Sequence, residues 1–417
     1  MRGYLVNPIG VAVSAALALP LSLPSGAVAA PPAAPAAPAA TDPEPRPGPA
    51  GIPGSTQSLP LPPPAPASRS LAPLLPRGLL RTGVRPFSLA GVVWDDPDAE
   101  LRGTVQIRTR LSGTRRWTAW RTVDTHRQDH GADPGTAEHR AARGSTAPLW
   151  TGPSDGVEAR VRPRTAEPFP TPPLPQGLRL DLVDPGRLTA QATRPEPARV
   201  PDAPQAVPAA PAAKPYIGPR PKIVTRKGWG ASESLREKGF VYTTTVKAAF
   251  VHHSATGNSS TCKQSPSVLR GIYRYHVVSS GWRDIGYNFA VDKCGNIYEG
   301  RAGGMASAVR GAHTLGFNTN SMGIAVLGSY SRSNPPKAAV TAIAKLTAWK
   351  LGLFQGNPKG KVTLVSGGSG KYAKGRKVRF NVISGHRDGF RTDCPGTRLY
   401  NRLGTARKAS AGYQGRP

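Results

Sequence analysis

Acidic residues are scarce in this chain. Its 417 residues include 24 Asp and Glu against 55 Lys and Arg, which gives a formal net charge of +31. From residue 220 to the end, 7 acidic residues face 32 basic ones, a net charge of +25, so the first 219 residues carry only +6. The C-terminal half is therefore expected to seek a polyanion, and nucleic acid, teichoic acids and carboxylate-rich cell wall all qualify.

Recognisable nucleic-acid motifs are also lacking. The basic residues are scattered along the C-terminal half. Basic charge alone supports only nonspecific attraction to nucleic acid. Together with the signs of export described next, this argues against nucleic acid and leaves anionic cell-wall polymers as partners.

Long apolar runs are missing except near the N-terminus. Residues 11–23 are rich in Ala and Leu, but prolines interrupt the run and it is too short to span a bilayer. Arg2 precedes the run, and Ala27-Val28-Ala29 supplies the small-x-small pattern of a cleavage site. Residues 1–29 are therefore predicted to be a signal peptide, and the protein is expected to be secreted, cell-wall associated and without a membrane span.

Cysteine is rare as well, and its count of three is odd. Export permits disulfides, yet one cysteine is left over if two pair. The economical assignment is a Cys262–Cys294 bridge, with Cys394 kept as a thiolate beside a histidine. The alternative places Cys394 in a disulfide and leaves one of the other two unpaired.

Proline and glycine, by contrast, are abundant, with 46 and 47 residues. Residues 30–71 and 187–219 are dominated by Pro and Ala and are predicted to be linkers. Between them, residues 72–186 contain short runs of alternating apolar and polar residues separated by Gly-containing turns, which predicts an antiparallel β-sandwich. Its tryptophans are expected to fill the core, although exposed ones would suggest a carbohydrate-binding face.

The C-terminal part mixes strand and helix patterns. Strands are predicted at 247–253, 287–291 and 322–327, and amphipathic helices follow Ser265-Pro266 and begin at Lys337. Interleaved strands and helices indicate an α/β domain over residues 220–404. Residues 405–417 are expected to be a basic tail.

Three residues of this domain suggest a metal site. His252 ends a predicted strand, and His386 and Cys394 lie close together near the C-terminus. Two imidazoles and a thiolate can hold Zn²⁺ and leave a fourth position for water, which is the arrangement of a catalytic site. His253 follows His252 in the strand and should point to the other face as a packing residue.

The sequence between these ligands resembles a known family. The runs DIGYNF at 284–289, IYEGR at 297–301 and GAH at 311–313 occur in the order found in peptidoglycan recognition proteins and type 2 N-acetylmuramoyl-L-alanine amidases. The run VTRKGWGA at 224–231 looks like the usual start of that family. The resemblance covers residues 220–404 and implies a mixed central sheet flanked by helices.

The resemblance also implies roles for single residues. His252, His386 and Cys394 match the family's zinc ligands, Tyr287 matches its active-site tyrosine, and Thr392 matches a position that is Thr in animal amidases. The implied activity is hydrolysis of the amide between N-acetylmuramic acid and L-alanine, with peptidoglycan as partner and the protein as a monomer. Some family members bind muropeptides without hydrolysing them, so a non-catalytic muropeptide-binding protein is the alternative. Those members usually lose the cysteine ligand, whereas this chain keeps Cys394.

Two further residues have open roles. Arg301 is expected either to face carboxylates of the stem peptide or to take a structural role, as a salt bridge or a solvated surface position. His313 is expected either to line the groove or to support it. Many animal members that recognise diaminopimelate peptides have Gly-Trp after the Glu-Gly-Arg run, whereas here Ala302 follows Arg301. The family's rule for stem-peptide preference therefore does not transfer to this chain.

Overall fold

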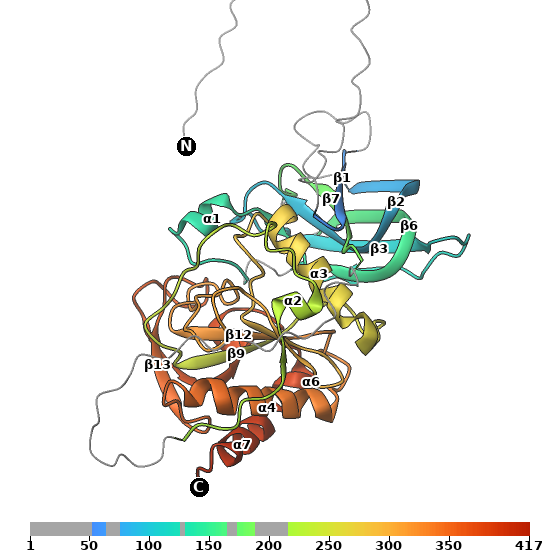
Figure 1. The fold of residues 1–417 in the computed structure, drawn as a ribbon. Helices are drawn as coiled ribbons and strands as arrows, with labels where there is room; N and C mark the ends of the chain where they lie inside the picture. The colour runs from blue at the N-terminus through green and yellow to red at the C-terminus, as the bar shows by residue number, and fades with distance from the viewer. Residues whose placement is uncertain (1–51, 64–75, 126–129, 165–172, 188–215) are drawn as a thin grey trace, which may run out of the picture. The chain divides into compact units, whose positions relative to one another are not determined.

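The computed structural model describes residues 52–63, 76–125, 130–164, 173–187 and 216–417 (Figure 1). The predicted signal peptide at 1–29 and most of the two Pro- and Ala-rich segments lie outside these ranges. Within them, no helix is both long and apolar enough to cross a bilayer. The described elements form an N-terminal antiparallel sheet and a C-terminal α/β domain.

The N-terminal sheet has the strand order β1-β7-β2-β6-β3-β4, with β5 paired to β2. Every pairing is antiparallel, as the alternating sequence predicted. Hydrogen bonds connect all of these strands, and their division into the two packed layers of a sandwich stays a prediction. The elements are β1 (Ser55–Pro60), β2 (Arg77–Trp94), β3 (Gly103–Leu111), β4 (Arg121–Val123), α1 (Ala137–Ala141), β5 (Gly144–Ser145), β6 (Leu149–Pro163) and β7 (Arg179–Asp184).

The boundary of this domain differs from the prediction. Strand β1 lies inside the segment 30–71 that was predicted to be a linker, yet it pairs along its length with β7. The hydroxyl of Ser58 donates a hydrogen bond of 2.6 Å to Asp181. From Ser55 the sequence can form a strand. The overall Pro- and Ala-rich composition of residues 30–71 conceals this local change.

The tryptophans divide into two groups. Trp94 and Trp150 are buried, as predicted for core residues. Trp117 and Trp120 are only half-buried, and the guanidinium carbon of Arg160 lies 4.0 Å from the ring centroid of Trp120. The core interpretation therefore holds for two of the four.

The C-terminal domain is built on a sheet with the order β15-β9-β12-β10-β11-β8. The pair β10–β11 is antiparallel and the other pairs are parallel, so the sheet is mixed. The elements are β8 (Ile223–Val224), α2 (Arg226–Trp229), β9 (Ala248–His253), η3 (Cys262–Gln264), α3 (Ser265–Arg274), η4 (Tyr275–Ser279), β10 (Phe289–Val291), β11 (Ile297–Glu299), β12 (Ser321–Val326), α4 (Lys337–Gly352), β13 (Lys361–Val365), β14 (Lys377–Asn381), β15 (Ile383–Gly385), α5 (His386–Gly389), α6 (Thr397–Tyr400) and α7 (Leu403–Tyr413).

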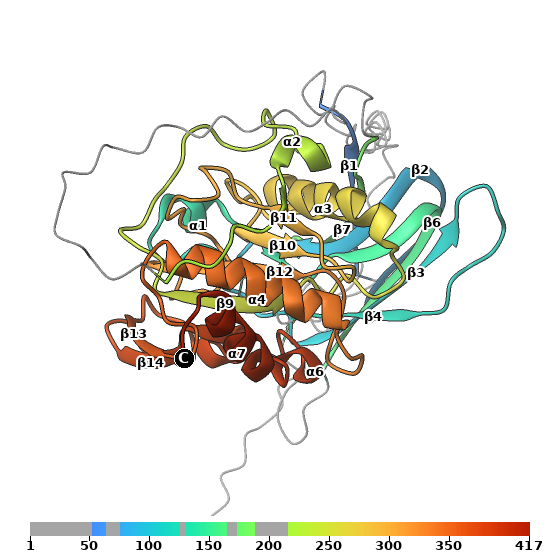
Figure 2. The same cartoon turned by 60° about the horizontal axis from the view of Figure 1, so that its bottom comes forward.

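Helices cover both faces of this sheet. Side chains alternate between faces along a strand, so Phe289 and Val291 pack with α4 and α7 in one core cluster. Ala290 and Ala325 point the other way and pack with α3 in a second cluster. Figures 1 and 2 show α4 and α7 lying together beside the sheet. The sheet itself is mixed, as predicted.

The C-terminal end is part of the fold. Residues 405–417 were expected to be a basic tail, but Leu403–Tyr413 form helix α7. Leu403 and Ala406 are buried in the core, and Thr347 of α4 donates a hydrogen bond of 2.9 Å to Ser410. In the sequence, basic residues lie among the few apolar residues of this helix, so its apolar side is not evident from composition.

Helix α3 and the turn η4 also contact the N-terminal sheet. Leu89 of β2 lies in the same buried cluster as Leu269 of α3. The hydroxyl of Tyr275 lies 3.3 Å from the carbonyl of Val92 on β2. A side chain at Gly91 has no room, because its Cβ would lie 2.3 Å from that hydroxyl. The two domains are therefore closely packed at this contact.

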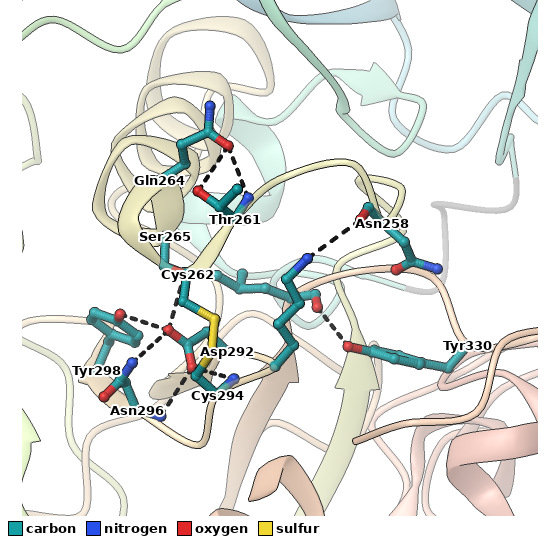
Figure 3. Close-up of a disulfide and its surroundings, with 12 residues drawn as sticks. Asn258, Thr261, Cys262, Gln264, Ser265, Asp292, Cys294, Asn296, Tyr298 and Tyr330 are labelled. Carbon is teal, nitrogen blue, oxygen red and sulfur yellow. Dashed lines mark hydrogen bonds between the residues drawn. A yellow bond between two sulfur atoms is a disulfide. The ribbon is translucent and has the colours of Figure 1, made fainter.

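A disulfide joins Cys262 to Cys294 (Figure 3), the predicted pairing. It links the start of η3 to the turn after β10. Beside it, the buried carboxylate of Asp292 accepts hydrogen bonds from the side chains of Ser265 and Tyr298. The bridge thus holds the N-terminal end of α3 against the sheet.

Replacing both bridge cysteines by serine should lower the free energy of unfolding by about 3–4 kcal/mol, because the closed loop spans 32 residues and restricts the unfolded chain. Urea unfolding measures the change. Treating the parent with a phosphine reductant is the matched control and should shift the midpoint equally. An unchanged midpoint in both would contradict a stabilising bridge.

Candidate metal centre

The register between two parallel strands brings His252 and His386 together. In the pairing of β15 with β9, Gly385 lies opposite Val251. The residues that follow them, His252 in β9 and His386 at the start of α5, therefore lie at the same end of the two strands. The ring centroids of His252 and His386 are 4.4 Å apart. Both side chains are fully buried.

Cys394 reaches the same point from the loop after α5. Its Sγ lies 3.8 Å from Nδ1 of His252 and accepts a hydrogen bond of 3.4 Å from the backbone N–H of His253. A cysteine binds metal through its thiolate form. The side chain of His253 turns away, and its Nδ1 accepts from the backbone N–H of Tyr330 at 3.3 Å.

A chain of hydrogen bonds orients His252 from behind. Its Nε2 lies 3.4 Å from the hydroxyl of Thr314, which lies 3.0 Å from Nδ1 of His313. On the far side, Nε2 of His313 is 3.5 Å from the hydroxyl of Ser321. If Thr314 accepts from His252 and donates to His313, Nδ1 of His252 keeps its lone pair for the metal.

The electrostatics favour the same protonation state. Burial lowers the pKa of His252 well below its usual value, and the neighbouring His386, His130 and His313 lower it further. A neutral imidazole is the form that binds metal. The donors are nitrogen and thiolate sulfur, so the set fits zinc.

A fourth donor belongs to the cluster. Within the described part of the chain, four potential ligand atoms lie within 4.8 Å of one another, and they belong to His130, His252, His386 and Cys394. His130 comes from the loop between β4 and α1 of the N-terminal domain. The sequence analysis missed it, because a lone histidine in a loop rich in Asp, Gly and Pro has no spacing that marks it as a ligand.

Tyr287 and Thr392 border the cluster. The ring centroid of Tyr287 is 5.4 Å from that of His252, and the side chain is 3% exposed. The hydroxyl of Thr392 is half-buried and accepts a hydrogen bond of 3.1 Å from the backbone N–H of Cys394. Tyr287 lies beside His252 and Thr392 beside Cys394, while their catalytic roles stay predictions.

The two predicted substrate-binding residues, His313 and Arg301, are both buried. His313 is fully buried behind His252, which corresponds to the supporting role. Arg301 is buried, and its guanidinium donates to Glu138 of α1 at 2.6 Å and 3.0 Å. Arg301 thus forms the salt bridge that was its alternative role, with a partner in the other domain.

Changing Thr314 to Val should weaken zinc binding about 10- to 100-fold, because it removes the acceptor that orients His252 while nearly keeping side-chain volume. Competition with a chromophoric chelator measures the affinity. Thr314→Ser keeps the hydroxyl and should bind zinc like the parent. Equal affinities for the Val and Ser variants would show that the hydroxyl has no such role.

Comparison with known proteins gives matches for both domains. A family model described as N-acetylmuramoyl-L-alanine amidase matches residues 242–397, and one described as galactose-binding domain-like and N-terminal matches residues 48–199. Peptidoglycan-recognition protein SC2 of Drosophila simulans is 31% identical over 183 residues, which are 44% of this chain and 85% of that protein.

Two more matches cover the same part of the chain. N-acetylmuramoyl-L-alanine amidase of Homo sapiens is 30% identical over 202 residues, 47% of this chain and 30% of that protein. The solved structure of Drosophila PGRP-LB is 26% identical, covers 44% of this chain and 93% of its own, and has a TM-score of 0.34.

Proposed function

Because the chain belongs to the peptidoglycan recognition protein family, we propose that its C-terminal domain is a secreted, zinc-dependent N-acetylmuramoyl-L-alanine amidase. Its reaction is hydrolysis of the amide between N-acetylmuramic acid and L-alanine of the stem peptide. The observation that carries this proposal is the convergence of His252, His386 and Cys394 as buried metal donors beside Tyr287.

The chemistry divides between the metal and the side chains around it. Bound zinc supplies a Lewis acid that acidifies water and polarises the amide carbonyl. The phenol of Tyr287 would donate a hydrogen bond to the substrate oxygen as negative charge develops on it. The hydroxyl of Thr392, which accepts from the backbone N–H of Cys394, would orient the attacking water or the substrate oxygen.

A non-catalytic muropeptide-binding role is the second candidate, since some relatives are named for recognition alone. The complete donor set supports the amidase over it, because binding a muropeptide requires no buried thiolate beside two imidazoles. The relative from Homo sapiens that carries the amidase name supports the same choice.

Charge and sequence support a location at the cell wall. The net charge of +25 from residue 220 onward attracts anionic wall polymers, and residues 1–29 have the pattern of a signal peptide.

Arg301 would meet a carboxylate of the stem peptide only after separating from Glu138.

Changing Cys394 to Ser should reduce zinc content and abolish hydrolysis while leaving some peptidoglycan binding, because a serine hydroxyl is a poor replacement for a thiolate ligand. Metal analysis and mass spectrometry of digested sacculi, with and without chelator, measure the two effects. Changing Cys262 and Cys294 to Ser leaves the metal donors in place and is the matched control. Normal turnover in Cys394→Ser would refute the zinc mechanism.

Changing Tyr287 to Phe keeps the ring packing and removes only the hydroxyl. We expect this variant to fold, retain zinc and lose about 10²–10³ in kcat, with little change in substrate affinity, because the lost hydrogen bond forms in the chemical step. Steady-state kinetics on a soluble muropeptide measure the change. Full kcat would make Tyr287 a packing residue and move the role to Thr392.

A further inference from the structure

His130 lies among the three predicted zinc ligands although it belongs to the other domain. Its ring centroid is 4.4 Å from that of His386 and 5.1 Å from that of His252. One of its nitrogens lies within 4.8 Å of a donor atom of each of the three ligands. The four residues together offer three nitrogens and one sulfur.

The loop that carries His130 is fastened to the C-terminal domain. The side-chain amide of Asn318 donates to the carbonyl of Gly131 at 2.8 Å and to the carboxylate of Asp133 at 2.7 Å. The backbone N–H of Gly316 donates to the same carboxylate at 2.8 Å. Gly131 has a φ of 141°, which suits glycine and turns the loop immediately after His130.

The same asparagine also positions the support of His252. Oδ1 of Asn318 accepts hydrogen bonds from the backbone N–H groups of His313 and Thr314 at 2.8 Å and 3.1 Å. Asn318 is 1% exposed. One buried side chain therefore holds the His130 loop with its nitrogen and the segment behind His252 with its oxygen.

We propose that His130 is a fourth ligand of the metal and that the N-terminal domain thereby holds the amidase in a closed state. This inference rests on the proposed function. Four protein ligands complete a tetrahedral zinc site, whereas a catalytic site keeps one position for water or substrate. His130 must therefore leave before hydrolysis begins.

A second contact between the domains works in the same direction. Glu138 of α1 pairs with Arg301, and both side chains are buried. The carboxylate also accepts from the backbone N–H of Arg283 at 3.2 Å. While the domains stay docked, Glu138 pairs with the guanidinium of Arg301. Docking would therefore block the fourth metal position with His130 and keep Arg301 from binding another anion.

The ligand count is tested on the full chain loaded with Co²⁺ in place of zinc. Each histidine ligand contributes one strongly shifted, exchangeable N–H proton resonance, so the parent should show three and His130→Ala should show two. Zinc affinity, measured by chelator competition, should fall at least about tenfold in His130→Ala. His139→Ala, a change of the same kind in α1, is the matched control and should leave both readouts unchanged.

Removing the fourth ligand should also raise turnover. An open state populated at about 0.1–10% in the parent predicts a gain of about 10- to 1,000-fold in His130→Ala, measured with zinc above the Kd of each variant. Asp133→Ala keeps His130 but releases its loop, so it should weaken the third N–H resonance and raise turnover as well.

Two results would overturn the inference. If the parent shows two histidine resonances and His130→Ala shows the same two, His130 is not a metal ligand. If turnover falls or stays the same in His130→Ala, His130 does not hold the enzyme in a less active state. Failure of the proposed function looks different, because the parent would then bind no metal or Cys394→Ser would hydrolyse normally.

Discussion

The candidate site depends on the parallel pairing of two short strands. Three residue pairs join β15 to β9, and they place His386 beside His252 at one edge of the sheet. A shift by one residue would turn each side chain of β15 to the opposite face and would displace His386, which directly follows β15, from the cluster. The flanking core clusters keep this register, because β9 and β15 are buried along their length. Thr314 and Cys394 then complete an arrangement that the sheet has already positioned.

Much of the C-terminal domain could be predicted from periodicity. The amphipathic spacing after Ser265-Pro266 predicted α3, and the apolar runs predicted β9 and β12. Motif order led to the three predicted ligands, which the structure brings together, and the odd cysteine count led to the disulfide. These features are local or carried by short motifs, so a single sequence contains them.

Features that depend on contacts between distant residues were missed. Strand β1 is stabilised by pairing with β7, and α7 by packing on α4, so neither stands out in local composition. Arg301 had two open roles because its partner Glu138 lies 163 residues away in the chain. His130 reaches the ligands only through docking of the N-terminal domain, and no local pattern encodes that contact.

The division of the four donors between two domains has a thermodynamic consequence. A metal that contacts all four donors binds the docked arrangement more tightly than the undocked one, so docking and metal binding strengthen each other by the same factor. The buried amide of Asn318 adds to this coupling, because its two ends hold the His130 loop and the backbone behind His252. Scarcity of the metal would therefore loosen the grip of the N-terminal domain, and tight docking would in turn let the protein retain its metal in surroundings where little is available.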